Sequence, residues 1–361
     1  MLMILLLLPL LASATAFSLQ DEAAAATAFS LDEPSLRESS PSLCDDVTQY
    51  AGYFDLRTGL DKHYFYWFFE ARKKPANAPV VLWMTGGPGC SSEVALFGEN
   101  GPCAVNAAGN GTKKNAFSWN EHANLIYIDQ PAGTGFSYGT GYDSDEKGVS
   151  TDMVDFLKQF FEAHPEYAKN DFYIFGESYG GHYVPAVTHA VWLDNKAGGT
   201  VNLKGMGVGN GLTNPEIQYK YYKDMIVSTN NHDAAVSETV HKLMSLAAPA
   251  CVAAIRACER NGTSTVCLPA LELCEATQLM PYTATGLNPY DMRVQCAKPP
   301  LCYDFSNVKT YLNRDDVRKA LGVDDVKRPK KWADCMMACR KQGCFKLSEG
   351  GSRGDRAGLL T

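Results

Sequence analysis

The sequence lacks the features that mark several large functional classes. Its 361 residues carry 33 Lys and Arg against 40 Asp and Glu, so the basic excess typical of nucleic-acid-binding proteins is absent. The formal charge of −7 also argues against an anionic membrane surface as the main partner. After the first residues, no stretch has the roughly 20 apolar residues of a membrane span. These absences leave a globular protein with one large domain or two ordinary ones.

Motifs for metals and nucleotides are also missing. The 12 cysteines form no C-x-x-C pair with interleaved histidines, so we expect no metal site. The glycine-rich GGPG at 86–89 is not followed by Gly-Lys-Ser or Gly-Lys-Thr, which excludes a phosphate-binding loop. The sequence therefore predicts neither a metal nor another cofactor.

The N-terminus has the pattern of a secreted protein. About ten apolar residues precede the small-residue triplet A-T-A, which predicts a signal peptide over residues 1–16, although the usual basic residues are missing. Residues 17–43 are rich in Ala, Ser and Glu and are expected to be a disordered or propeptide-like leader. Sequons at Asn110 and Asn261, each within a glycine-containing turn, predict glycosylation.

The cysteine content also favours the secretory pathway, because a chain with a signal peptide and 12 cysteines is expected to form disulfides. Four of them are spaced by 7, 9 and 7 residues, which invites a nested pairing of Cys251 with Cys274 and Cys258 with Cys267. A further small loop can be closed between Cys296 and Cys302.

Apolar runs predict an α/β fold. Residues 44–212 are expected to form the core, with strands at 63–70, 80–84, 124–129, 171–175 and 203–211. Several of these runs are apolar on both faces, as in a buried, largely parallel sheet. Helices are expected at 150–163 and 183–194, and alternation of strands and helices indicates α/β layers.

The pattern of apolar residues in the sequence changes after residue 212. Residues 213–305 are cysteine-rich and weakly periodic, which predicts an insertion or cap. The chain is expected to return to the core at 306–338, with a helix at 313–322 that Asn313 caps and Gly322 ends. Residues 339–361 have no apolar periodicity and are expected to be a disordered tail.

The strongest motif is FYIFGESYGG at 172–181. A strand pattern leads directly into G-x-S-x-G, and a helix pattern follows, which predicts a nucleophile elbow presenting Ser178. A second segment, WMTGGPGCSS at 83–92, places adjacent glycines just after a predicted strand. Its backbone amides and the amide of Tyr179 are the type of donors that form an oxyanion hole.

Four segments together resemble the serine carboxypeptidase family of α/β-hydrolases, in family order: LWMTGGPGCSS, DQPAGTGFSYG, GESYGGHYVP and VGNGLTNP. The resemblance implies Ser178 as nucleophile and the amides of Gly87 and Tyr179 as oxyanion hole. It implies that four residues bind the terminal carboxylate of a peptide substrate: Thr85, Gly86, Glu99 and Glu177. It also implies a disulfide between Cys90 and Cys335. The pairing of Cys44, Cys103, Cys339 and Cys344 stays open, with Cys44–Cys103 as one candidate.

The two glutamates carry a chemical requirement. A substrate carboxylate cannot bind beside two ionised carboxylates, so Glu99 and Glu177 must share at least one proton. This predicts cleavage at acid pH, and a lysosome, vacuole or secreted location. Where many relatives carry Asn, this chain has Thr85, whose hydroxyl can still donate one hydrogen bond.

A general base for Ser178 is not evident. The histidines that follow it are His182, His189, His232 and His241, and none lies where a strand end would direct an imidazole at the serine. The resemblance places the triad Asp and His beyond Cys335, where this sequence becomes the low-complexity tail. We therefore expect a truncated or frameshifted member of this family that lacks the last strands of the sheet. The alternative interpretations are an inactive peptide-binding homologue and an acyltransferase on the same scaffold.

Overall fold

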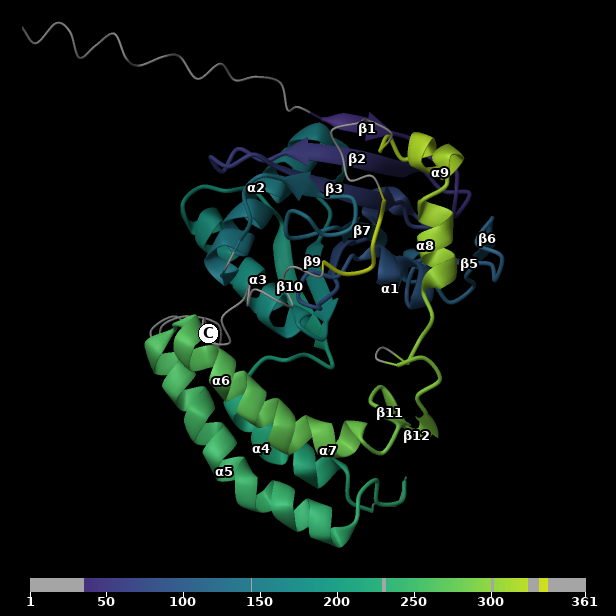
Figure 1. The fold of residues 1–361 in the computed structure, drawn as a ribbon. Coiled ribbons are helices and arrows are strands. Elements are labelled where there is room, and N and C mark those ends of the chain that lie inside the picture. The colour runs from purple at the N-terminus through teal and green to yellow at the C-terminus, as the bar shows by residue number, and fades with distance from the viewer. Residues whose placement is uncertain (1–35, 144, 229–231, 300–301, 324–330, 337–361) are drawn as a thin grey trace, which may run out of the picture. The chain divides into compact units, whose positions relative to one another are not determined.

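The computed structural model describes residues 36–143, 145–228, 232–299, 302–323 and 331–336 (Figure 1). The expected signal peptide, the first part of the leader and the tail at 339–361 lie outside the described residues. The boundaries expected for these three segments therefore stay predictions.

A mixed eight-stranded sheet forms the centre of the core, in the order β1-β2-β3-β7-β4-β9-β10, with β8 paired to β3. Strands β7, β4, β9 and β10 are parallel to their neighbours in this group. The pairs β1–β2, β2–β3, β3–β7 and β3–β8 are antiparallel. The strand bounds are β1 Arg37–Ser39, β2 Gln49–Asp55, β3 Lys62–Phe69, β4 Val80–Met84, β7 Asn124–Ile128, β8 Tyr138–Gly139, β9 Phe172–Glu177 and β10 Leu203–Gly209. The α/β fold and its five expected strands are confirmed.

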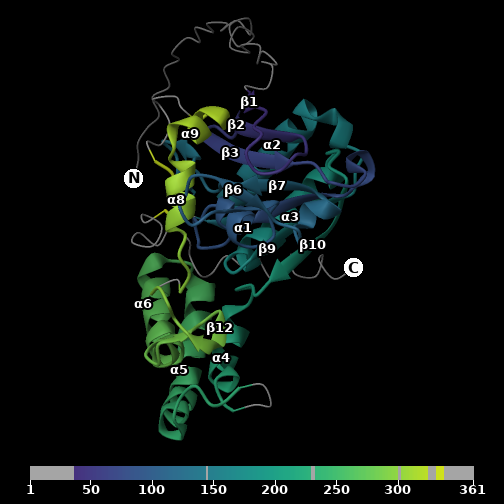
Figure 2. The ribbon, with the colours of Figure 1, turned by 90° about the vertical axis from the view of Figure 1, so that its right-hand side faces the viewer.

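Both faces of the sheet are buried at its central strands β3, β4 and β7, which explains why these strands are apolar almost throughout, whereas the edge strand β10 is partly exposed. In β3, Tyr64, Tyr66 and Phe68 pack into one core and Phe65, Trp67 and Phe69 into the other, following the period of two of a strand. Helices α2 (Glu146–Ala163) and α3 (Gly180–Lys196) cover the first face. Helices α1 (Glu93–Gly98), α8 (Ser306–Leu312) and α9 (Asp315–Ala320) cover the second (Figures 1 and 2).

The leader prediction is wrong at its end. Residues 37–39 form β1, which pairs in antiparallel register with β2, Arg37 opposite Tyr53. Arg37 forms an ion pair with Asp55, and Glu38 accepts hydrogen bonds from Tyr66 and lies 2.9 Å from Nε2 of the buried His164. These charged contacts hold a segment whose polar composition gives no strand pattern.

The helix expected at 313–322 is present as α9, which begins two residues later, at Asp315, and α8 before it was not expected. The Asn313 side chain accepts a hydrogen bond from the Trp332 amide (2.7 Å) and donates to the Trp332 carbonyl (3.0 Å). Asn313 therefore binds a distant segment instead of capping α9, whose N-cap is Arg314. Gly322, at φ 67°, follows the end of α9 as expected.

The segment 213–305 contains the helices α4 (Pro215–Met225), α5 (Glu238–Asn261), α6 (Ser264–Cys274) and α7 (Met280–Thr283) and the hairpin of β11 (Leu287–Asn288) and β12 (Asp291–Gln295). Two disulfides join α5 to α6, Cys251 to Cys274 and Cys258 to Cys267. By length and composition alone, α5 is apolar enough to cross a membrane, which the sequence reading missed. Its Cys251 and Ile255 are buried against neighbouring helices, as in a helix of a folded cap.

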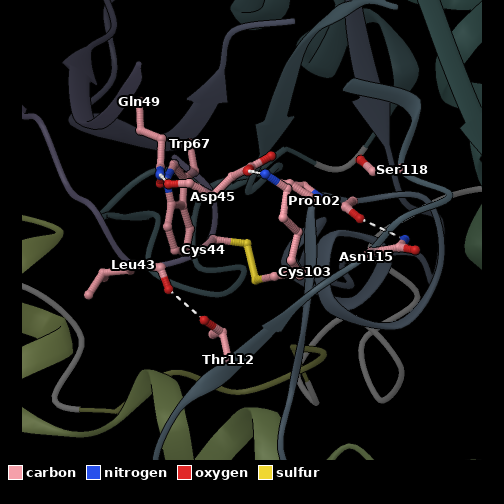
Figure 3. Close-up of a disulfide and its surroundings, with 12 residues drawn as sticks. Leu43, Cys44, Asp45, Gln49, Trp67, Pro102, Cys103, Thr112, Asn115 and Ser118 are labelled. Carbon is pink, nitrogen blue, oxygen red and sulfur yellow. Dashed lines mark hydrogen bonds and ion pairs between the residues drawn. A yellow bond between two sulfur atoms is a disulfide. The ribbon is translucent and has the colours of Figure 1, made fainter. Parts of the chain in front are cut away.

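Five disulfides occur in the described residues: four join pairs expected from the sequence, and Cys44–Cys103 resolves a pairing that the sequence left open. Besides the two in the cap, they are Cys44–Cys103, Cys90–Cys335 and Cys296–Cys302. Figure 3 shows Cys44–Cys103 beside the small hairpin of β5 (Cys103–Val105) and β6 (Thr112–Lys114), where Thr112 donates to the Leu43 carbonyl at 2.7 Å. This hairpin carries Asn110 in its exposed turn.

Candidate active site

Ser178 occupies a sharp turn between β9 and α3. Its φ of 56° lies in the left-handed region, which costs a non-glycine residue about 1–3 kcal/mol. Three backbone hydrogen bonds hold this conformation: the Ser178 amide donates to Gly209, and the Ser178 carbonyl accepts from Gly181 and from Leu212 at 2.8 Å. The serine is exposed, so the strained turn presents its hydroxyl to solvent.

The loop after β4 lies directly against this turn, because β4 and β9 are parallel neighbours with Met84 opposite Gly176. A β-carbon at Gly86 would lie 2.3 Å from the amide nitrogen of Tyr179 and 2.8 Å from the carbonyl oxygen of Glu177. Tyr179 is the N-cap residue of α3, where backbone amides point outward along the helix dipole. The expected oxyanion loop and the expected nucleophile are thus brought together.

Several residues that the sequence reading missed fix this loop. The Ser92 hydroxyl accepts a hydrogen bond from the Thr85 amide and donates to the Trp83 carbonyl, both at 3.2 Å. The Tyr183 hydroxyl accepts from the Gly89 amide at 3.2 Å. Both residues lie inside the motifs quoted above, in CSS and in GGHYVP, so the motifs contained them without indicating their role.

Replacing Gly86 by alanine is expected to separate the loop from the elbow. The added methyl group would overlap backbone atoms of Glu177 and Tyr179, and neither can rotate away as a side chain can. Overpacking of this kind costs about 1–3 kcal/mol or more. We expect a lower midpoint of urea denaturation. Gly205→Ala is the matched control, since its added β-carbon would meet only the Tyr173 ring, at the ordinary contact distance of 3.6 Å, and its φ is not positive.

Glu99 and Glu177 meet beside Ser178. Glu99 follows α1, and its amide donates to the Ala95 carbonyl at the end of that helix. Burial among protein atoms and the Glu177 carboxyl, to which it is hydrogen bonded, raise the pKa of Glu99 to about 8. The residue still has exposed surface, so a ligand can reach it. A hydrogen bond between two carboxyl groups requires a proton, as the sequence predicted for this pair.

The hydroxyl of Thr85 is oriented by a neighbour. The indole Nε1 of Trp83 donates to Thr85 Oγ1 at 3.1 Å. Because that oxygen already accepts a hydrogen bond, its own proton is left to donate. The side chain is buried, at the end of β4 beside Gly86.

The four candidate histidines occupy other environments. His182 packs against the Tyr179 ring, with 4.8 Å between ring centroids, and burial lowers its pKa to about 4. His189 stacks on Trp192, His232 binds the Asp233 carbonyl and His241 lies 3.9 Å from Asp224. Within the described residues, no hydrogen bond joins a histidine to the Ser178 hydroxyl. No group of three or more His, Cys, Asp or Glu in that part of the chain is arranged to hold a metal.

Comparison with known proteins decides the family. A family model described as serine carboxypeptidase matches residues 41–347. The chain belongs to the serine carboxypeptidase family. Among curated serine carboxypeptidase relatives, serine carboxypeptidase-like 48 of Arabidopsis thaliana is 46% identical over 294 residues, which are 80% of this chain and 56% of that protein.

Other relatives give the same result. Serine carboxypeptidase 3 of Hordeum vulgare is 45% identical over 288 residues, 78% of this chain and 55% of that protein. Carboxypeptidase Y homolog A of Blastomyces gilchristii is 42% identical over 281 residues, 78% of this chain and 51% of that protein. This serine carboxypeptidase chain thus spans about half the length of the curated relatives it matches.

A solved structure agrees on the fold. The crystal structure of Kex1Δp, a prohormone-processing carboxypeptidase from Saccharomyces cerevisiae, superposes with a TM-score of 0.68. The match covers 86% of this chain and 72% of that one, at 24% sequence identity. At this identity the likeness supports the α/β-hydrolase fold of a serine carboxypeptidase.

Proposed function

We propose that this chain binds the free C-terminal carboxylate of peptides at Glu99 and Glu177. In the complete protein, we propose, Ser178 cleaves the last peptide bond through an acyl-enzyme. The observation that carries the proposal is the hydrogen-bonded glutamate pair beside an exposed serine in a strained turn. A protonated carboxyl donates a hydrogen bond to a carboxylate, so the pair selects free C-termini over internal peptide segments. A lipase or an esterase would have no use for this arrangement.

Thr85 and the backbone of Gly86 are the further groups proposed to hold that carboxylate. Both lie at the end of β4, and Gly86 is against the Tyr179 amide. With the substrate carboxylate fixed there, the scissile carbonyl oxygen would lie toward the amides of Gly87 and Tyr179. Those donors would stabilise the negative charge that develops on the oxygen during attack by Ser178.

Proton transfer decides between cleavage and binding alone. Because no histidine hydrogen bonds to the Ser178 hydroxyl in the described residues, binding without turnover is the second candidate function. The loss of triad members typically lowers turnover by about 10⁴ to 10⁶. Labelling of Ser178 by a fluorophosphonate probe would support the nucleophile, and peptide binding without labelling would support the second function.

The compartment is proposed from the same chemistry. Disulfides persist in the oxidising secretory route, and five of them occur in the described residues. An acidic compartment such as a lysosome or vacuole keeps the glutamate pair protonated. Exposed Asn110 and Asn261 are proposed to carry glycans there.

The test of the proposal is the pH dependence of peptide binding. For the unchanged chain we expect constant affinity for a fluorescent peptide below pH 7 and a fall of about tenfold per pH unit above the Glu99 pKa of about 8. The variant Glu99→Gln keeps a donor that does not titrate, so its affinity should fall less steeply over this range than that of the unchanged chain. Fluorescence anisotropy measures both.

Two controls define the outcome. The same peptide with an amidated C-terminus should bind at least tenfold more weakly, because the carboxylate is the group recognised. Glu99→Ala removes a hydrogen bond to a charged group and should weaken binding by about 10- to 100-fold at pH 5. Equal binding of amidated and free peptides would overturn the proposed site.

A further inference from the structure

A second pair of carboxyl groups lies below the loop that contacts the elbow. Glu93 is the first residue of α1, and Asp129 follows the end of β7. Both residues are completely buried, at 0% exposure. They come from the segments CSSE and IDQP, which had no role in the site described so far.

Two of the four carboxyl oxygens of Glu93 and Asp129 accept hydrogen bonds from neighbouring residues. The Ser91 hydroxyl donates to Oε2 of Glu93, and the Phe136 amide donates to Oδ2 of Asp129 at 2.7 Å. The other two, Oε1 of Glu93 and Oδ1 of Asp129, have no donor among the described residues. The two carboxyl groups are in hydrogen-bonding contact with each other, and two carboxylates form such a bond only when they share a proton.

No ion pair joins either carboxyl group to a cation in the described part of the chain. Arg318 of α9 lies 5.9 Å above the Phe136 ring and donates to the Val323 carbonyl at 2.7 Å. Other contacts with the pair come from uncharged groups, Ser91 and the Phe136 amide. Burial and the Glu93 carboxyl raise the pKa of Asp129 well above its ordinary value.

The pair is connected to both parts of the proposed site. The Ser91 hydroxyl, which donates to Glu93, accepts from the Trp332 indole at 3.0 Å. The Ser91 amide donates to the Asp334 carbonyl at 2.8 Å, next to the Cys90–Cys335 disulfide. Helix α1 begins with Glu93 and has six residues, and Glu99 follows its last residue. A displacement of Glu93 therefore moves the loop and the glutamate that would bind substrate.

We propose that Glu93 and Asp129 are positioning residues, and that the proton they share holds the Gly86–Ser92 loop and Glu99 in their binding geometry. When the pair loses this proton, two buried like charges repel, and α1 moves away from the end of β7. Substrate binding then fails even though Ser178 and Glu99 are unchanged. This role rests on the proposed function, since it makes that site dependent on a second acid pair.

The direction of the pH effect follows from the folded and unfolded states. An Asp in an unfolded chain has a pKa of about 3.9, and that of Asp129 in the folded protein is higher. The stability contributed by the shared proton is therefore complete below about pH 4. It is lost as the pH rises toward the folded pKa. The equilibrium constant for local opening of the loop then increases by up to about tenfold per pH unit.

Asp129→Asn isolates this effect. The amide oxygen can accept from Phe136 and the amide nitrogen can donate to the Glu93 carboxylate, so the variant reproduces the protonated pair at every pH. Hydrogen exchange of the Ser91, Phe136 and Met336 amides is measured from pH 5 to pH 8 and corrected for the intrinsic rate. We expect protection in the unchanged chain to fall at least tenfold and protection in Asp129→Asn to stay constant.

Glu93→Gln is the reciprocal variant and should give the same flat profile. Asp171→Asn, at an exposed position before β9, is the matched control and should follow the unchanged chain. Parallel profiles in all four proteins would overturn the proposal. Failure of both amide variants to fold at pH 5 would also overturn it, because each amide replaces the hydrogen bond of the protonated pair.

Peptide affinity provides a readout that a purely structural role would not move. In Asp129→Asn, the pH at which affinity for a free-carboxylate peptide begins to fall should lie higher than in the unchanged chain. If affinity falls over the same pH range in Asp129→Asn and in the unchanged chain, the pair does not control the proposed binding site. If no protein in the series binds the peptide, the proposed function fails, and the exchange profiles still decide whether the pair holds the loop.

Discussion

Removal of the Cys90–Cys335 disulfide is expected to lower the free energy of unfolding by about 5 kcal/mol. The bridge joins residues 245 positions apart, and the loop-closure account gives about 4.7 kcal/mol for a loop of 100 residues, rising slowly with length. The variant Cys90→Ala with Cys335→Ala removes the bridge without leaving a free thiol. Urea denaturation followed by tryptophan fluorescence measures the loss.

A local effect should accompany the global one. Two backbone hydrogen bonds flank the bridge, from Ser91 to Asp334 and from Met336 to Gly89, both at 2.8 Å. Without the covalent link, these bonds and the buried Trp332, whose indole donates to Ser91, hold residues 331–336 against the loop that packs on the elbow. We expect peptide affinity to decrease in the variant under conditions where it is still folded.

The Cys258–Cys267 bridge is the matched control, since it joins residues only 9 apart within the cap. The same account gives about 2.5–3 kcal/mol for a loop of this size. Its removal should leave exchange of the Ser91 amide unchanged. Equal losses for the two bridges would contradict a loop-closure origin of the difference.

Lys62→Met is expected to destabilise the fold by about 3–5 kcal/mol at neutral pH, because it leaves two buried carboxylates without their cation. The ammonium of Lys62, on β3, lies 2.6 Å from Asp143 and 2.7 Å from Asp152. The Tyr64 hydroxyl also donates to Asp152, at 3.1 Å. All three charged side chains are almost completely buried, at 3%, 5% and 2% exposure.

The size of this loss should depend on pH. Burial already raises the pKa of Asp143 to about 6 with Lys62 present, and removal of the cation raises it further. A carboxyl with a raised folded pKa contributes most below its unfolded pKa of about 3.9 and loses that contribution as the pH rises. The difference between Lys62→Met and the unchanged chain should therefore be smaller at pH 4 than at pH 7.

A neutral replacement of the whole cluster tests the cause. Lys62→Met combined with Asp143→Asn and Asp152→Asn removes every charge, and such replacements are often close to neutral in stability. Thermal melts at pH 7 should place the triple variant well above the single one. A single variant as stable as the unchanged chain would show that the ion pairs contribute nothing.

Much of the fold was predictable, because the central strands of the sheet are buried on both faces. Strands such as 80–84 and 124–129 are continuous apolar runs bounded by turns, and the structure confirms them as β4 and β7. The elbow was predictable for a different reason, since only glycine fits on either side of Ser178. A β-carbon at Gly176 would lie 2.4 Å from the Met84 carbonyl oxygen, and one at Gly180 would lie 2.9 Å from it.

Elements held by distant side chains were not predictable. β1 depends on Asp55 and His164, and the break between α8 and α9 depends on Trp332. Neither partner is near in sequence, so local composition indicated a leader in the first case and a helix cap at Asn313 in the second. The Glu93–Asp129 pair was missed for the same reason, because 36 positions separate two acidic residues that look like ordinary polar ends of elements.

The position of β1 has a consequence for maturation. Arg37 and Glu38 are bound to β2, β3 and the end of α2, so β1 is held by contacts that involve no residue before position 36. A processing protease that cut anywhere upstream of it would release the preceding peptide and leave the outer strand in place. The edge of β2 would then stay shielded from intermolecular pairing after trimming.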